Sequence, residues 1–435
     1  MGFLKEVIKR IKRGIFFVFI VVGYYLIPHR KFSLDSSDTQ LGFIVGEFFR
    51  DDLGKFGGYG MTAKNFTDYY NSRKNKYKVQ IVIPQGFPVI QNPEVQVIHN
   101  TPTLLRPESK KNYILNFIKY QRIIRRQKIS LYITIDYYSS YEYSLLADPK
   151  TPVMVWIRDP RCKMEWDKIA TVSLEMEIRD KKDKDEFLKL SLADAQSLHR
   201  VLKLANRFKR KIIFVTNAHC LTDRGRRTYQ LPHIEPHWLP NPIPIPDIAE
   251  ITFSQKPSLL FLGRLEPQKR FWIIGELAKR FKDVDFYFGG VTSYPQLMNP
   301  IIDRYANLPN VKFLGLITGE TKNQLMRETW GLINTSIHEG LPVSFLETMA
   351  YGKCVISCLN PENLVERFRY FTGEFLGDGL DEHSLDLFSK KINEFLNDSK
   401  NRIEKGKQGL EYILQNHSFS NFENHFAEIL RKESI

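Results

Sequence analysis

The sequence contains little cysteine, and its cysteines lack the spacing of a metal site. Four thiols in 435 residues are too few for a disulfide scaffold. Cys354 and Cys358 are close in sequence, but no second pair accompanies them. We therefore expect reduced, buried thiols and neither a disulfide framework nor a zinc site.

The sequence also lacks an apolar run that would span a membrane comfortably. Residues 14–27 are apolar, but a helix of that length reaches only about 21 Å, short of the ~30 Å hydrocarbon core. Before them, Leu4, Ile8 and Ile11 have helical spacing with lysines opposite, and no small-residue cleavage site follows. An interfacial or re-entrant anchor fits this pattern best. A marginal span and a helix packed on the protein itself are the alternatives.

Acidic residues are outnumbered by basic ones in one part of the chain only. Residues 1–247 contain 41 Lys and Arg against 25 Asp and Glu, a net charge of +16. Residues 248–435 contain 22 against 24, a net charge of −2. The basic half would attract anions or an anionic membrane surface. No zinc-finger, RNP-type or helix-turn-helix pattern supports binding to nucleic acid.

After Lys31, short apolar runs alternate with amphipathic stretches, which predicts βαβ units and parallel sheets. Strands are expected at 42–46, 79–83, 95–99, 131–135, 153–157, 212–215, 259–263, 285–288, 311–314, 331–334 and 354–357. Helices are expected at 61–72, 111–126, 187–207, 271–281, 295–305, 321–329 and 344–351, and within 166–178. Residues 239–246 have proline at every second position from Pro240, which predicts a semi-rigid extended linker. Two doubly wound domains so joined would face each other across a cleft, where ligands bind.

The most specific segment places a carboxylate and a glycine between a strand and a helix. Glu339 and Gly340 lie in the loop, the helix starts near Ser344, and Glu347 lies in its first turn. Free backbone N–H groups and the positive helix end make such a loop suitable for a diphosphate or sugar hydroxyls. A capping box of Ser344 and Glu347 is the alternative, but it leaves Glu339 and Gly340 unexplained.

A second loop is basic. Gly263 closes a strand into a tight turn, Arg264 supplies a bidentate fork, and Lys269 supplies a compact charge for a pyrophosphate. The alternative for both cations is a solvated basic loop before a helix.

In the first segment, seven residues separate two glutamates that small residues flank: Glu339, Gly340, Pro342, Glu347, Ala350 and Gly352. This pattern resembles the signature of family 4 (group 1) retaining glycosyltransferases of GT-B fold. The loop from Gly263 to Lys269 is similar to the phosphate loop of that family. Weaker similarities are the glycine loop Phe56–Gly60, the pair Gly289-Gly290, and the stretch Phe313–Ile317, which resembles the strand and loop that line the nucleotide base.

The resemblance implies roles for individual residues. Glu347 would hold the ribose hydroxyls, Glu339 would contact the donor sugar, and the cations Arg264 and Lys269 would neutralise the leaving diphosphate. Sugar and phosphate would meet the loop of Gly340, Leu341, Pro342, Val343 and Ser344, chiefly through its backbone N–H groups. The remaining donor-binding positions would be Gly263, Gly58, Gly289 and Ile317. The resemblance further implies retention at the anomeric carbon, no cofactor and no obligatory metal.

Two features depart from the family or from its fold. The family often has a histidine where Val153–Ile157 here runs into Arg158 and Asp159. These residues replace that histidine, shape an unusual acceptor pocket, or form a buried structural arrangement. Asp283-Val-Asp285 spells a metal-chelating motif of the other large transferase fold, but it lies between a helix end and a strand, so we interpret it as incidental. The histidines, His338 among them, carry no assignment.

The acceptor side is the more basic one. Residues 110–128 contain seven Lys and Arg and no acid, and Phe117 and Ile124 lie on one helical face. Such a helix is either a solvated face over the core or a contact for anionic lipid headgroups. We predict a lipid-linked or otherwise anionic acceptor, and a peripheral or monotopic location on the cytoplasmic face of the membrane.

Together, these patterns predict an α/β protein of GT-B fold with an N-terminal hydrophobic or amphipathic helix. The expected segments are a membrane-associating segment (1–32), an N-terminal Rossmann-like acceptor domain (33–246), a C-terminal Rossmann-like nucleotide-sugar domain (247–415) and a closing helix (416–435). The expected function is hexosyl transfer from a nucleotide-diphosphate sugar to a lipid-linked or saccharide acceptor. The alternatives are a non-catalytic membrane partner of the same fold, and another GT-B enzyme such as a phosphorylase or an epimerase.

Overall fold

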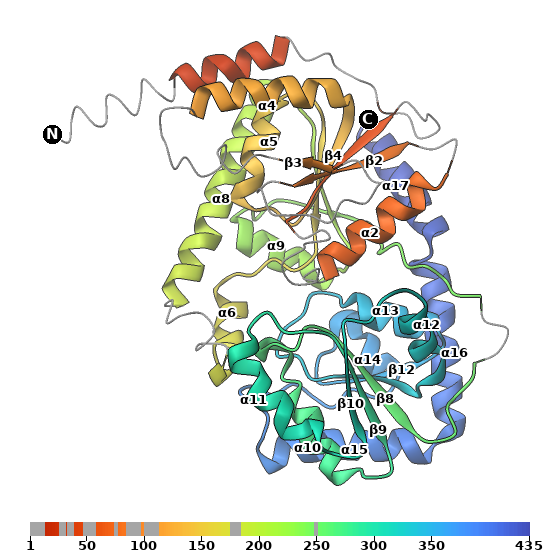
Figure 1. Ribbon diagram of the computed structural model, residues 1–435. Helices are drawn as coiled ribbons and strands as arrows, with labels where there is room; N and C mark the ends of the chain where they lie inside the picture. The colour runs from red at the N-terminus through yellow and green to blue at the C-terminus, as the bar shows by residue number, and fades with distance from the viewer. Residues whose placement is uncertain are drawn as a thin grey trace.

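The structure is a computed structural model, and it describes residues 14–25, 32, 39–46, 58–73, 77–83, 97–99, 113–174, 184–247 and 251–435. The described chain forms two α/β halves that lie one above the other in Figure 1. We call the half up to residue 247 the N-terminal domain and residues 251–416 the C-terminal domain. The last helix, α17 (Phe419–Lys432), returns to the N-terminal domain.

The N-terminal domain is built on a seven-stranded parallel sheet in the order β3-β2-β1-β4-β5-β6-β7. Its strands are β1 (Gln40–Ile44), β2 (Lys78–Ile83), β3 (Val97–His99), β4 (Ile129–Ile135), β5 (Val153–Ile157), β6 (Ile212–Thr216) and β7 (His237–Trp238). Every residue of β4 and β5 is buried. Both strands are therefore mostly apolar along their length, as expected for parallel strands covered on both faces.

Helices cover both faces of this sheet (Figure 1). They are α2 (Gly58–Asn71), α4 (Tyr113–Gln127), α5 (Glu142–Ala147), α8 (Lys184–Arg207) and α9 (Cys220–Tyr229), with the 3-10 turn η1 (Ser139–Tyr141). The short helix α6 (Lys163–Ile169) instead packs on the C-terminal domain, where Ile169 joins the core. On one face, Phe66 of α2 meets Phe422 of α17 edge to face, with ring centroids 5.5 Å apart. The C-terminal helix is therefore part of the first domain's core.

The C-terminal domain has a five-stranded parallel sheet in the order β10-β9-β8-β11-β12. Its strands are β8 (Ser258–Leu262), β9 (Asp285–Gly289), β10 (Val311–Gly315), β11 (Gly331–Asn334) and β12 (Cys354–Ser357). Its helices are α10 (Trp272–Arg280), α11 (Pro295–Ala306), α12 (Gly319–Glu328), α13 (Val343–Ala350), α14 (Leu364–Arg367), α15 (Glu382–Asn397) and α16 (Ser399–Asn416), with 3-10 turns η2 (Pro267–Lys269) and η3 (Pro361–Asn363). In each sheet the winding reverses beside the first strand, β1 or β8.

The expected arrangement of two doubly wound parallel sheets is confirmed. Each expected strand is present to within two residues, and each expected helix between strands to within three. The elements β7, α5, α9, α14, α15 and α16 were not among those expected. Residues 239–246 are extended, but Leu239 and Ile243 are buried, and the Ile243 N–H donates to the His417 carbonyl at 2.9 Å. The segment is therefore extended as expected, and it is in addition packed into the body of the protein.

All four cysteines are free. Cys354 and Cys358 are buried as expected, Cys162 is partly buried, and Cys220 is exposed. The expectation of buried thiols is therefore wrong for Cys220, which opens α9 at the surface.

Residues 14–25 form a helix that lies against α4 (Figure 1). The rings of Phe16 and Phe117 are 4.5 Å apart, and the backbone at Gly23 is so close to Gln121 that a Cβ would clash with its amide. The predicted amphipathic pattern of residues 3–13 lies outside the described residues. Within the described parts of the chain, no helix combines the length and apolarity needed to cross a membrane.

Candidate active site

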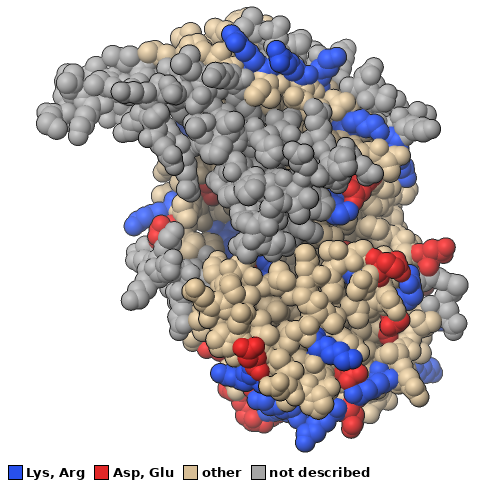
Figure 2. All heavy atoms as spheres, viewed as in Figure 1, with Lys and Arg blue, Asp and Glu red and all other residues tan. Residues whose placement is uncertain are grey.

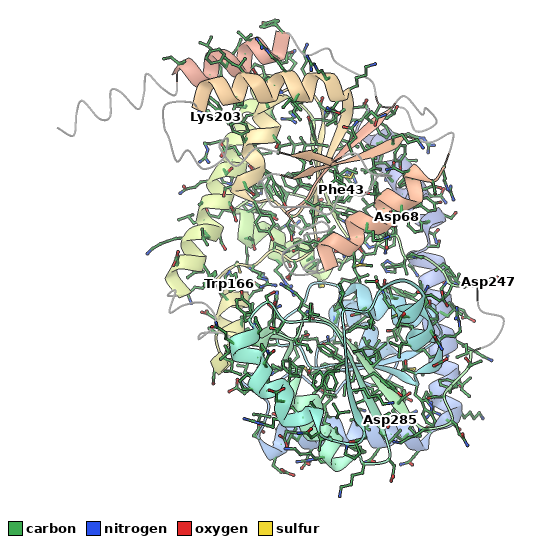
Figure 3. The ribbon with its side chains drawn as sticks, in the orientation of Figure 1. Phe43, Asp68, Trp166, Lys203, Asp247 and Asp285 are labelled. Atoms are coloured by element: carbon green, nitrogen blue, oxygen red, sulfur yellow. The ribbon has the colours of Figure 1, made fainter. Side chains whose placement is uncertain are left out.

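A cavity of about 620 Å³ lies between the two domains. Its walls come from the loops that follow β1, β4 and β5 in the N-terminal domain and β8 and β11 in the C-terminal domain. Parallel strands deliver their following loops to one edge of a sheet, and here both edges face the same space. Trp166 of α6 contributes to the wall at the level where the domains meet (Figure 3).

The basic loop after β8 forms one wall. Arg264 and Lys269 line the cavity, whereas Gly263 does not. Gly263 turns directly beside Gly290, where a Cβ would lie 1.8 Å from the Gly263 carbonyl oxygen and φ is +156°. Gly290 thus allows the close approach of the two chain segments at the start of the basic loop. Arg264 has Glu266 as a partner, with Nη1 and Oε2 3.3 Å apart.

Glu339 is paired with Lys269 in the same wall. Lys269 Nζ donates to Glu339 Oε1 at 2.5 Å, and Ser336 Oγ donates to the same oxygen at 2.7 Å. The two charged side chains are only 18% and 13% exposed. The interpretation as a solvated basic loop is therefore wrong for Lys269, since a cation and a carboxylate are held together at the edge of a cavity.

The loop after Glu339 contacts the opposite domain. A Cβ at Gly340 would lie 2.0 Å from the Arg158 carbonyl oxygen, so only glycine fits there. Leu341, Pro342 and Val343 also line the cavity, and α13 starts at Val343. The free N–H groups at the start of this helix therefore lie beside the cavity.

Five of the predicted site residues do not line the cavity, namely Gly263, Gly289, Ile317, Ser344 and Glu347. Glu347 Oε1 accepts from Lys322 Nζ of α12 at 2.7 Å. Pro342, and not Ser344, is the N-cap of α13, and no side chain caps the helix, so the capping-box alternative is wrong. Ile317 lies against Gly289, where a Cβ would be 2.4 Å from Ile317 Cδ1.

The N-terminal wall contains a buried acid. Asp136 follows β4, is 2% exposed and accepts from the Arg158 N–H at 2.8 Å and the Asp159 N–H at 2.9 Å. The hydroxyl of Tyr59, next to Gly58 at the start of α2, also donates to it. Burial raises the pKa of Asp136 to about 6, although these hydrogen bonds oppose the rise. Gly58 itself lines the cavity, and Phe56 and Gly57 lie outside the described residues.

Arg158 and Asp159, where the family often has a histidine, turn in different directions. Arg158 Nη1 donates to Asn241 Oδ1, the guanidinium lies 4.9 Å from the Trp156 ring, and burial lowers the pKa of Arg158 to about 10. Asp159 instead contacts His338 of the C-terminal domain, with Oδ1 and Nε2 2.8 Å apart. Arg158 is thus buried among structural contacts, and Asp159 connects the domains. Both residues also line the cavity, so a part in an unusual acceptor pocket stays a prediction.

Comparisons with known proteins agree with this architecture. Residues 247–411 match the profile of the family described as "Glycosyl transferases group 1". The C-terminal domain therefore carries the group 1 profile, and the protein is a glycosyltransferase. No curated protein sequence matches the chain.

Solved structures resemble this glycosyltransferase over nearly its full length. HepE of Anabaena in complex with UDP and glucose is 16% identical, with a TM-score of 0.60, over 91% of this chain and 100% of its own. The apo form of WaaB, a lipopolysaccharide outer core galactosyltransferase, is 15% identical, with a TM-score of 0.55, over 91% and 100%. Sucrose-phosphate synthase of Thermosynechococcus elongatus is 12% identical, with a TM-score of 0.64, over 91% and 98%. At these identities the likeness shows the fold alone, which is GT-B.

This glycosyltransferase uses a nucleotide-diphosphate sugar as donor. Sequence reasoning overlooked several residues in its cavity wall or beside it, namely Tyr59, Asp136, Arg224, Gln268 and His338. Asp136 was the easiest of these to find from the sequence, because it directly follows the buried strand β4, at the edge of the sheet that faces the cavity. Asp285 of the Asp283-Val-Asp285 motif opens β9, and it pairs with Lys256 at the end of the domain far from the cavity (Figure 3).

Proposed function

We propose that the enzyme transfers a hexose, with retention at the anomeric carbon, to a lipid-linked or saccharide acceptor at the cytoplasmic face of a membrane. The observation that carries the donor half of this proposal is the position of Arg264, Lys269 and Glu339 around one cavity between the domains. Two cations and a carboxylate beside a helix N-terminus suit a diphosphate and the hydroxyls of a sugar.

In this proposal the reaction is a single displacement of the diphosphate. The bond between the anomeric carbon and the diphosphate oxygen breaks, and its electron pair stays on the diphosphate. The acceptor oxygen bonds to the anomeric carbon from the same face and gives its proton to the diphosphate. Arg264 and Lys269 stabilise the charge that develops on the leaving group, which is worth about 3 kcal/mol for one such donor.

Glu347 keeps its proposed role as the contact for the ribose hydroxyls. It lies one helix turn beyond the start of α13, and its contact with Lys322 leaves its second oxygen to accept a hydroxyl. Glu339 contacts the donor sugar, and backbone N–H groups between Gly340 and Ser344 contact sugar and phosphate. UDP-glucose is the first donor to test, because HepE was solved with UDP and glucose.

The donor half is tested by a thermal-shift panel of UDP, GDP and ADP and their glucose or mannose conjugates. We expect one nucleotide base to stabilise the protein, and Glu347→Ala and Arg264→Ala each to weaken that binding by about tenfold or more. Ser389→Ala on α15, outside the cavity wall, is the control and should bind as the parent protein does. Absence of stabilisation by every nucleotide would remove the proposal. Stabilisation that survives both substitutions would remove the site assignment.

The membrane half of the proposal rests on the helix at residues 14–25. One of its faces packs on the N-terminal domain, yet the opposite face is also apolar and exposed: Ile15 43%, Val18 56%, Val22 40% and Tyr25 76%. Two cations flank it on one side, with Lys150 Nζ 4.7 Å from the Tyr24 ring and Arg207 Cζ 4.8 Å from the Phe17 ring. Lys and Arg side chains also gather at this end of the molecule in Figure 2. An exposed apolar face with cations beside it is the pattern of an interfacial helix on an anionic membrane.

If the exposed face of this helix contacts the membrane, a double substitution of Val18→Ser with Val22→Ser should weaken that contact. We expect the variant's recovery on phosphatidylcholine vesicles that contain phosphatidylglycerol to fall roughly fivefold or more in a sedimentation assay. The control variant is Leu380→Ser with Leu414→Ser. It changes two exposed leucines of the C-terminal domain, the second of them on α16, and should leave recovery unchanged. Equal recovery of the parent protein and the Val18/Val22 variant would contradict membrane contact through this helix.

A further inference from the structure

Two loops from different domains meet beside the cavity with backbone against backbone. Residues 158–161 follow β5, and residues 337–340 follow β11. A Cβ at Gly340 would lie only 2.0 Å from the Arg158 carbonyl oxygen. The neighbour of Gly340 is Glu339, the proposed contact of the donor sugar. The position of Glu339 therefore depends on a loop of the other domain.

His338 and Asp159 form the side-chain contact between these loops. His338 Nε2 lies 2.8 Å from Asp159 Oδ1, and the two side chains are 3% and 14% exposed. Arg224 of α9 adds a second connection, because its Nη1 donates to the Glu339 carbonyl at 2.9 Å and lies 3.5 Å from Asp159 Oδ1. Asp159 thus reaches the backbone of Glu339 along two routes, one through His338 and one through Arg224.

The carboxylate of Asp159 is itself held from the N-terminal domain. Arg161 donates to its Oδ2 through Nη2 at 2.7 Å and through Nε at 3.1 Å. The backbone N–H of Asp159 donates to the buried Asp136. Burial alone would raise the pKa of Asp159, but Arg161 and His338 lower it well below its usual range. A carboxylate that stays charged and is bonded on both sides has little freedom to move.

Gln268 extends the contact into the phosphate loop. Arg161 Nη1 donates to Gln268 Oε1 at 3.2 Å, and Gln268 Nε2 donates to the His338 carbonyl at 3.0 Å. Gln268 directly precedes Lys269, the partner of Glu339. The connection between the domains therefore ends at Glu339 and Lys269 of the C-terminal domain, which are proposed to act on the sugar and the diphosphate.

We propose that Asp159 and His338 form a latch between the domains that positions Glu339 against the donor sugar. Both are positioning residues, since they act through the backbone of Glu339 and not by touching the donor. The inference rests on the proposed role of Glu339. Glu347, Arg264 and Lys269, the proposed contacts of ribose and diphosphate, pair with side chains other than the latch residues Asp159 and His338. Loss of the latch should therefore weaken binding of the sugar and spare binding of the nucleotide.

The test compares UDP with UDP-glucose by titration calorimetry, or the corresponding pair if the thermal-shift panel selects another base. In Asp159→Asn and in His338→Phe, we expect the affinity for the nucleotide to stay within about threefold of the parent protein. The ratio of the two dissociation constants, nucleotide sugar over nucleotide, should rise about tenfold. The kcat of donor turnover should fall at least as much. His338→Gln, whose amide still donates to Asp159, should recover most of the loss.

Lys168→Met is the matched control. It removes another ion pair between the domains, Lys168 Nζ to Glu374 Oε2 at 2.6 Å, at a place where neither residue lines the cavity. Its ratio of dissociation constants should equal that of the parent protein. An unchanged ratio in both latch variants, or an equal rise in Lys168→Met, would overturn the latch. Failure of the parent protein to bind any nucleotide would instead overturn the proposed function, so the two failures are distinct.

Discussion

Lys269→Met is expected to lower kcat by about 10²–10³ while the protein remains folded. Methionine keeps most of the aliphatic stem of lysine and removes its charge. Lys269 is the C-terminal domain's ammonium group at the cavity wall, and it is fixed there by Glu339. A cation held in place before the reaction stabilises the leaving diphosphate without reorganisation, which is why its loss acts on the transition state more than on binding. Steady-state kinetics with the donor selected by the nucleotide panel would measure the effect.

The same substitution in a Glu339→Gln variant distinguishes two possible roles of Lys269. If its only task were to neutralise Glu339, the substitution would have little effect in an enzyme that already carries Glu339→Gln. We expect instead a further loss of at least tenfold in that background, since the diphosphate still lacks its cation. Lys256→Met serves as control, because Lys256 is half exposed and pairs with Asp285 away from the cavity. A kcat that falls equally in this control would contradict the assignment to Lys269.

The fold and the donor side of the site could be predicted because both depend on local patterns. A buried parallel strand is an apolar run bounded by turn residues, so β5 and β11 were placed to the residue. The loops after such strands meet at one edge of each sheet. Arg264, Lys269 and Glu339 could therefore be expected in one cleft, although they are up to 75 residues apart in the chain.

The domain contact could not be predicted, because it depends on how two separate sheets face each other. His338 carried no assignment in the sequence, and nothing near it in the chain marks Asp159 as its partner. Gly340 was expected to serve the ligand, yet its nearest neighbour is the Arg158 carbonyl. Likewise, Glu347 was expected either to cap its helix or to face the site, and its contact with Lys322 depends on the packing of α12 beside α13.

Gly406→Ala is expected to destabilise the C-terminal domain by about 3 kcal/mol, whereas Gly409→Ala, one turn later on the same helix α16, is not. A Cβ at Gly406 would lie 2.0 Å from the Gly352 carbonyl oxygen, which belongs to backbone and cannot rotate away. At Gly409 the nearest atoms belong to Met349 and lie 3.6 Å away, an ordinary contact. Alanine favours a helix interior over glycine by about 1 kcal/mol, so Gly409→Ala should be neutral or slightly stabilising.

The pair isolates one contact, since both substitutions add the same methyl group to the same helix. Gly352 closes the segment that begins at Glu339, and α13 between them carries Glu347 and packs against α16. A methyl group at Gly406 would therefore displace the element that carries the proposed ribose contact as well as lower stability. Thermal unfolding should show a midpoint about 6–12 °C lower for Gly406→Ala, with weaker nucleotide binding. Equal midpoints for the two variants would mean that α16 can shift away from the Gly352 turn, and would contradict a rigid contact behind the donor site.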